Sequence, residues 1–228
     1  MNIRVISVIS LIFLFVIASV MLIFTVSGGI SLDKAYADGS VLVVQKTSAG
    51  SIPHSVDITN NGNSTINVKQ GNTLSSSTSQ DLVIAENKQI TKNSTENVKA
   101  YCIDPSQRAV AGAKLIPINN TTSSINKLLN SSNPNDAQNA YNTQLEIYVI
   151  VSGGNLNPYT GEPVAIVETK GITWTQFRQD LAVAKNNVMS TFNVTESGIP
   201  TLNQTSDNNS SNWINDTINW IKSILNIQ

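Results

Sequence analysis

An uncharged apolar run near the start of the chain limits what the chain can fold into more than any other feature. Residues 5–26 carry no charge and are mainly Ile, Leu, Val and Phe, after a short basic start that ends at Arg4. Such a run has no polar face and is long enough to span a bilayer. Small residues at Ala35 and Ala37 also have the form of a cleavage site. The sequence therefore predicts a signal peptide or an N-terminal membrane anchor, a transmembrane helix, within residues 1–37.

Both alternatives place the rest of the chain outside the cytoplasm, either secreted or anchored to the cell membrane, because the basic end stays inside. The composition is typical of a cell-surface protein, since charged residues make up 13% of the chain against about 25% in an average soluble domain. Sites of the form Asn-x-Ser/Thr, such as those at Asn63 and Asn93, indicate a glycoprotein, with unmodified asparagine as the alternative. The net charge of −1 predicts that nucleic acid is not a partner.

Residues 38–118 predict a β-sandwich portion of the immunoglobulin-like kind. Val56 and Ile58 alternate with polar residues before an Asn-Gly turn, and Ile66 and Val68 follow it. This pattern predicts a hairpin. Short strands separated by turns are typical of a small sandwich, so we expect one in this part of the chain.

The pattern of apolar residues changes after Pro117, where spacings of three and four predict a helical portion with a short strand at residues 119–200. The expected elements are helices that start at Ser123 or Ser124, within residues 133–136 with Pro134 at or near the first turn, and at Thr173, with a strand at residues 164–168. The predicted fold class is therefore α+β.

The last part of the chain predicts a linker at residues 201–211 and an amphipathic helix at residues 212–228. Trp213 and Trp220 belong to the apolar half of that helix. Three roles stay open for it: docking on the domain, pairing with another chain, or lying in a membrane surface. The membrane is thus an expected partner through the N-terminal segment, and through this helix in the third case.

Common catalytic and metal-binding patterns are missing from the sequence. The single histidine, His54, follows Pro53 and is interpreted as a solvated loop residue. No spacing of His, Cys and carboxylates suggests a metal site. We therefore expect no catalytic residues, no metal and no cofactor, and the chain is predicted not to be an enzyme; a hydrolase with dispersed carboxylates is the disfavoured alternative.

One cysteine and one glutamine stand out against this background. Cys102 is the only cysteine, so no intrachain disulfide can form. It follows Tyr101 at the end of a predicted strand, and Gln144 lies on a predicted helix, followed by the bulky apolar pair Ile147 and Tyr148. This arrangement resembles the thioester domains of Gram-positive surface adhesins. That family joins an aromatic–Cys element to a Gln that precedes two bulky apolar residues, commonly with Trp where this chain has Tyr148.

The resemblance covers about residues 98–152 and implies a cell-surface adhesion or binding module. The thiolate of Cys102 would attack the side-chain carbonyl of Gln144, release ammonia and leave an internal thioester. An amine of a surface protein or of another amine-bearing ligand would then attack the acyl carbon and become linked through Gln144. Residues that could shield the bond from water form a pocket of Tyr101, Tyr141, Ile147 and Tyr148.

A plainer interpretation of the same residues stays open. Free cysteine is often buried and packs as a small apolar side chain, and Gln144 could lie on a helix surface. The chain would then be a passive envelope or structural protein that makes non-covalent contacts only.

Overall fold

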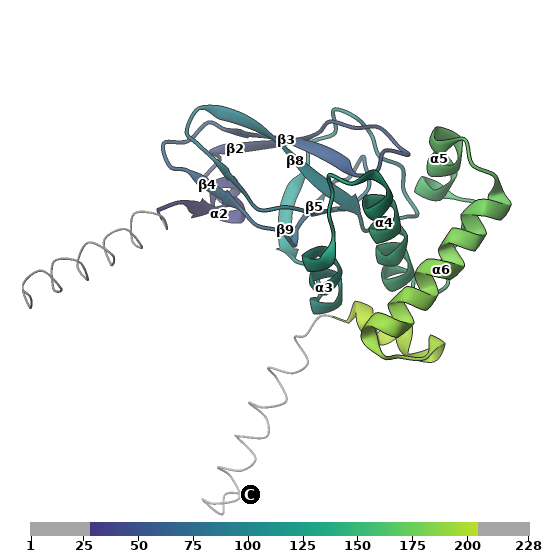
Figure 1. Ribbon diagram of the computed structural model, residues 1–228. Helices are drawn as coiled ribbons and strands as arrows, with labels where there is room; N and C mark the ends of the chain where they lie inside the picture. The colour runs from purple at the N-terminus through teal and green to yellow at the C-terminus, as the bar shows by residue number, and fades with distance from the viewer. Residues whose placement is uncertain (1–27, 205–228) are drawn as a thin grey trace, which may run out of the picture.

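The computed structural model describes residues 28–204, which form a mixed α+β fold (Figure 1). All of its strands lie before residue 121, and helices alone follow within the described range. Figure 1 shows the strands to one side and α3 to α6 to the other. The predicted fold class, α+β, is confirmed.

A six-stranded antiparallel sheet forms the larger part of the β portion. Its order is β2 (Val41–Gln45), β3 (His54–Asn60), β8 (Ser94–Cys102), β6 (Leu82–Ile84), β5 (Asn72–Ser75) and β9 (Ile116–Asn120). Residues 112–115, directly before β9, hydrogen-bond to β2: Gln45 N–H donates to the carbonyl of Ala113 at 2.9 Å, and Leu115 N–H donates to that of Val43 at 3.0 Å. These bonds join β2 to the segment that leads into β9, the outer strand at the other edge, and we call the result the closed sheet.

A smaller sheet contains β1 (Ile30–Ser31), β4 (Ile66–Val68) and β7 (Lys88–Ile90). The predicted hairpin is wrong, because β3 and β4 belong to different sheets. The side chain of Asn60 explains the change of sheet. Its amide donates to the carbonyls of Ser64 at 2.8 Å and Ile90 at 3.1 Å, while its oxygen accepts from Gly62 N–H at 2.9 Å. Asn60 thus directs the chain toward β7 instead of back along β3.

The core lies inside the closed sheet and extends to its helical neighbours. Alternate residues of β3 are buried, including Val56 and Ile58, as the period of a strand requires. The short helix α2 (Leu32–Ala37) adds Leu32 and Ala35, both buried, to the same core. The folded part therefore begins before the predicted boundary at residue 38, and cleavage after Ala37 would remove two core residues.

The helical portion consists of α3 (Ser123–Ser131), α4 (Ala137–Val151), α5 (Gly161–Lys170), α6 (Trp174–Phe192) and a 3-10 helix, η1 (Glu196–Asn203). Thr173 caps α6, as predicted, and Asp136 caps α4, because each side chain accepts a backbone N–H of the first turn. The start of α4 falls at the end of the predicted range 133–136, so Pro134 lies before the helix and not in its first turn. The cap of α3 is Thr122, one residue earlier than expected.

The strand predicted at residues 164–168 is wrong, since these residues form the middle of α5. Pro163 lies in the first turn, where its missing N–H costs nothing, and Gly171 ends the helix in a left-handed conformation. A short apolar run is compatible with either a strand or a buried helix, so its flanking residues decide the matter.

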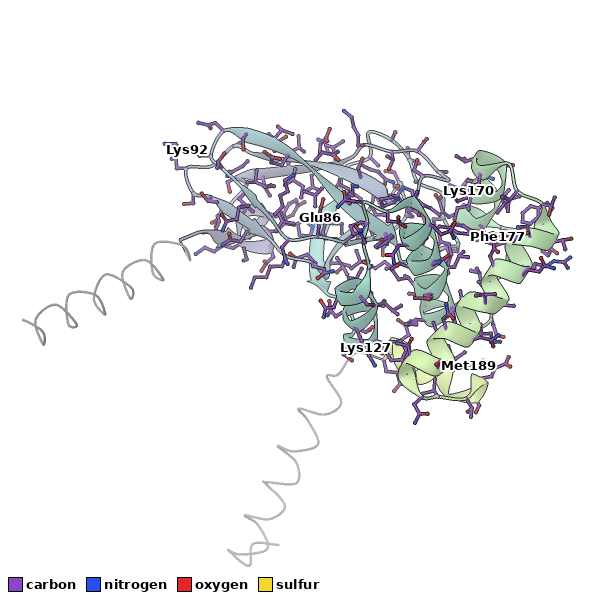
Figure 2. The ribbon with its side chains drawn as sticks, viewed as in Figure 1. Glu86, Lys92, Lys127, Lys170, Phe177 and Met189 are labelled. Carbon is purple, nitrogen blue, oxygen red and sulfur yellow. The ribbon has the colours of Figure 1, made fainter. Side chains whose placement is uncertain are left out.

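The helix α4 lies between the strands and α6 (Figure 1). Phe177 of α6 is fully buried, and the ammonium of Lys170 on α5 lies 4.5 Å from the ring centre of Tyr141 on α4. Figure 2 labels Phe177 and Lys170 on this side of the molecule and Lys92 at the far end of the strands. Aromatic and cationic contacts of this kind fix α5 and α6 against α4.

Within residues 28–204, no helix has the length and apolar character needed to cross a membrane. This finding contradicts the prediction of a transmembrane helix as far as the described part is concerned, and nothing in that part supports secretion or glycosylation. The apolar run at residues 5–26, most of the predicted linker and the predicted helix at 212–228 lie outside the described residues.

Candidate functional site

The site lies just before the start of β3, where β8 continues without a strand on one side. The first residue of β3 is His54, which pairs with Ala100 of β8. Cys102, two residues after Ala100, still pairs with Leu82 of β6 on the other side of β8. Backbone groups on the vacated side need other partners, because an unpaired buried N–H or C=O is costly.

The side chain of Gln144 supplies those partners. Cys102 N–H donates to Gln144 Oε1 at 2.9 Å, and Gln144 Nε2 donates to the carbonyl of Cys102 at 2.8 Å. Both residues are fully buried. The structure thus brings the predicted pair together, whereas Gln138, the other glutamine of α4, is exposed and bonds to Asn142.

The thiol of Cys102 lies among groups that disfavour its charged form. Burial, above all, raises the pKa of the thiol well above its ordinary value, and the negative charges of Glu162 and Asp104 act in the same direction. The hydroxyl of Tyr148 lies close enough to the thiol to interact with it and partly opposes the shift. Burial likewise raises the pKa of Tyr148, so both groups stay protonated at neutral pH.

The other residues of the predicted pocket lie elsewhere. Tyr101 is buried, but neighbouring strand residues point to opposite faces, and its hydroxyl lies near Ser132 and Thr143. Tyr141 is directed toward α6, where its hydroxyl donates to Asp180 at 3.0 Å. Ile147 is part of the general core. Of the four predicted pocket residues, Tyr148 is thus the one whose side chain interacts with the thiol of Cys102.

His54 is buried, with 1% of its surface exposed, so the prediction of a solvated loop histidine is wrong. Its Nδ1 lies 3.1 Å from Thr47 Oγ1, and its Nε2 lies 2.7 Å from Gln80 Nε2 and 3.2 Å from Glu162 Oε1. The residue was missed because its neighbour Pro53 suggested a loop. The alternation along β3 was a usable signal, because His54 lies two residues before Val56 and therefore faces the same, inward side of the strand.

Glu162, in the first turn of α5, is the second residue that sequence reasoning missed. Its fully buried carboxylate accepts from Gly50 N–H at 2.6 Å and from Ala109 N–H at 3.0 Å, besides contacting His54. Two loops of the β portion are thereby tied to α5. No pattern in the sequence marks this glutamate, because its partners are backbone groups far away in the chain.

Among residues 28–204, no group of three or more His, Cys, Asp or Glu side chains is arranged to hold a metal ion. No protein-family model, no curated protein and no solved structure matches this chain.

Proposed function

We propose that this chain is a cell-surface adhesion module that captures amines through an internal thioester between Cys102 and Gln144. The observation that carries the proposal is the pair of hydrogen bonds at 2.9 and 2.8 Å by which the main chain of Cys102 holds both ends of the Gln144 carboxamide. The residue whose sulfur would attack therefore fixes the group that would be attacked, and such positioning replaces much of the entropy cost of the reaction.

The same bonds suit the chemistry of thioester formation. As Cys102 Sγ bonds to Gln144 Cδ, negative charge develops on Oε1, which already accepts the N–H of Cys102 at 2.9 Å. A donor placed in advance at that distance stabilises such a charge. The Cδ–Nε2 bond then breaks, and ammonia leaves with the proton that the thiol gave up.

In the capture step, the leaving group would be the sulfur of Cys102 and no longer ammonia. An amine of a surface protein or another amine-bearing ligand attacks Cδ of Gln144, an amide bond forms, and the sulfur of Cys102 leaves and regains a proton. The full burial of both residues shields the thioester from water. Each site can capture only one amine, so the chain would act as a binding module and not as an enzyme. The covalent link would hold its partner more firmly than any non-covalent complex can.

Beyond the α+β fold class, the sequence predicts an immunoglobulin-like sandwich for the β portion. Antiparallel pairing and a core shared by the two sheets support it. The bonds between β2 and residues 112–115 instead favour a small barrel, since they join one outer strand of the larger sheet to the segment that leads into the other. We propose the barrel as the platform that presents Cys102.

A passive structural protein is the second candidate, and one observation favours it. The carboxamide of Gln144 completes the hydrogen bonds of β8 beyond the first residue of β3, which is a sufficient structural reason for a buried glutamine. The raised pKa of the Cys102 thiol also makes the unreacted pair stable at neutral pH.

The intact mass of the denatured full chain distinguishes the two candidates. The thioester predicts a mass lower by one ammonia, which Cys102→Ala and Gln144→Ala each abolish and Gln138→Ala leaves in place. Methylamine should then add its own mass to the protein and free one thiol for alkylation. The full mass together with an alkylatable thiol in the untreated chain would support the passive protein instead.

A further inference from the structure

The buried hydroxyl of Tyr148 is a polar group whose presence the fold does not explain. The side chain is fully buried, and its oxygen has no well-formed hydrogen bond within the described part of the chain. Its interaction partner is the thiol of Cys102. A buried polar atom without such a bond is unfavourable, so phenylalanine would fit the same space at lower cost.

Tyr148 lies near both reacting residues, Gln144 and Cys102. It follows Gln144 by four residues on α4, which places the two side chains one turn apart on the same face of the helix. Cys102 comes from β8, whose backbone the carboxamide of Gln144 already holds. The three fully buried residues therefore lie together in one place, where the hydroxyl is near the thiol and the carboxamide binds the backbone of the same cysteine.

Thioester formation requires a proton to move from the thiol of Cys102 to the side-chain nitrogen of Gln144. The thiol must lose its proton before or while Sγ bonds to Cδ, and the nitrogen must gain one to leave as ammonia. A free thiolate is disfavoured at Cys102 by burial and by the charges of Glu162 and Asp104. A hydroxyl that accepts one proton while it donates another avoids both a thiolate and an amide anion.

Building on the proposed thioester, we propose that the Tyr148 hydroxyl relays the proton from Cys102 Sγ to Gln144 Nε2. The oxygen accepts the proton of Sγ–H and passes its own proton to Nε2 while the Sγ–Cδ bond forms and the Cδ–Nε2 bond breaks. Tyr148 ends unchanged, and ammonia carries the transferred proton. In the capture step, the same hydroxyl returns a proton from the attacking amine to the sulfur of Cys102.

The test compares Tyr148→Phe with Tyr101→Phe in the full chain. Tyr101 is a matched control, because its hydroxyl is also buried without a well-formed hydrogen bond but lies on the opposite face of β8. Each protein is isolated in denaturant with its thiol intact and refolded between pH 6 and pH 8, and the loss of ammonia is followed by intact mass. Proton transfer by a positioned group contributes about 10²–10⁴-fold to a rate.

We expect Tyr148→Phe to lose ammonia at least about 100-fold more slowly than the unsubstituted chain, while Tyr101→Phe reacts at the unsubstituted rate. The rate in Tyr148→Phe should rise with pH, because attack then depends on free thiolate, whereas the unsubstituted rate should change little. An unchanged rate, or a slower one without the new pH dependence, overturns the relay and leaves the thioester standing. If the unsubstituted chain never loses ammonia, both proposals fail.

Discussion

Replacing Glu162 by alanine tests how strongly α5 is held to the β portion. The carboxylate accepts two backbone N–H groups, of Gly50 and Ala109, and lies 3.2 Å from Nε2 of His54. All of these contacts are buried. The substitution therefore leaves two amide donors without their acceptor and removes the carboxylate beside His54, in a place that water does not reach in the native state.

The expected loss of stability follows from those contacts. A hydrogen bond to a charged group contributes about 1.5–3 kcal/mol, so the two amide bonds together predict a loss of about 3–6 kcal/mol. For a domain of this size, that change lowers the melting temperature by roughly 6–24 °C.

Urea unfolding followed by circular dichroism measures the loss. Glu168→Ala is the matched control, because Glu168 lies on the same helix but is exposed, 3.9 Å from Arg108. We expect that control to stay within about 0.5 kcal/mol of the unsubstituted chain. A loss below about 1 kcal/mol for Glu162→Ala would refute the reasoning, since the buried amides would then have found other partners at little cost.

Two further substitutions test the packing and the electrostatics of the helical portion. Gly161→Ala should cost about 1–3 kcal/mol more than Gly171→Ala in thermal unfolding: both glycines have positive φ, but an added Cβ at Gly161 would lie 2.1 Å from the carbonyl of Pro105, and at Gly171 it meets open space. Equal losses would contradict this contact. Burial raises the pKa of Glu146, which Asn187 partly offsets, so the charged form destabilises the fold at pH 7 and the effect fades as the pH falls through the folded pKa. Glu146→Gln should therefore raise the free energy of unfolding at pH 7 and not at pH 3, and a gain of the same size at both pH values would exclude this cause.

Local patterns predicted the helical portion well where a capping side chain marks the start of a helix. Thr173 could be identified because it is a short polar residue directly before an apolar pattern of helical spacing, and the start of α4 could be placed within residues 133–136. The run at residues 164–168 could not be assigned in this way. Its helix begins in a contact between Gly161 and a distant loop, and that contact is not visible in the local sequence.

The β portion shows what alternation can and cannot predict. Alternation correctly indicated which residues of β3 point inward, but it carried no information on which strand pairs with which. The Asn-Gly turn suggested a hairpin, whereas the side chain of Asn60 bonds to residues near β7 and sends the chain into the other sheet. Long-range partners of a single side chain decided the topology.

The candidate site was predictable only in part. The resemblance to thioester domains of surface adhesins pairs Cys102 with Gln144, and the structure places the two residues in contact. The buried partners His54 and Glu162 could not be paired, because they are far apart in the chain and joined through loop amides.

The seam between β2 and residues 112–115 bears on how the domain behaves at high concentration. An outer strand with free N–H and C=O groups can be extended by a strand of another molecule, which is a route to aggregation. Within residues 28–204 the seam occupies these groups along part of β2, and α2 packs beside β9. The outer strands of the smaller sheet, β1 and β7, are only two and three residues long. Growth into fibrils by successive strand addition is therefore disfavoured by the topology itself.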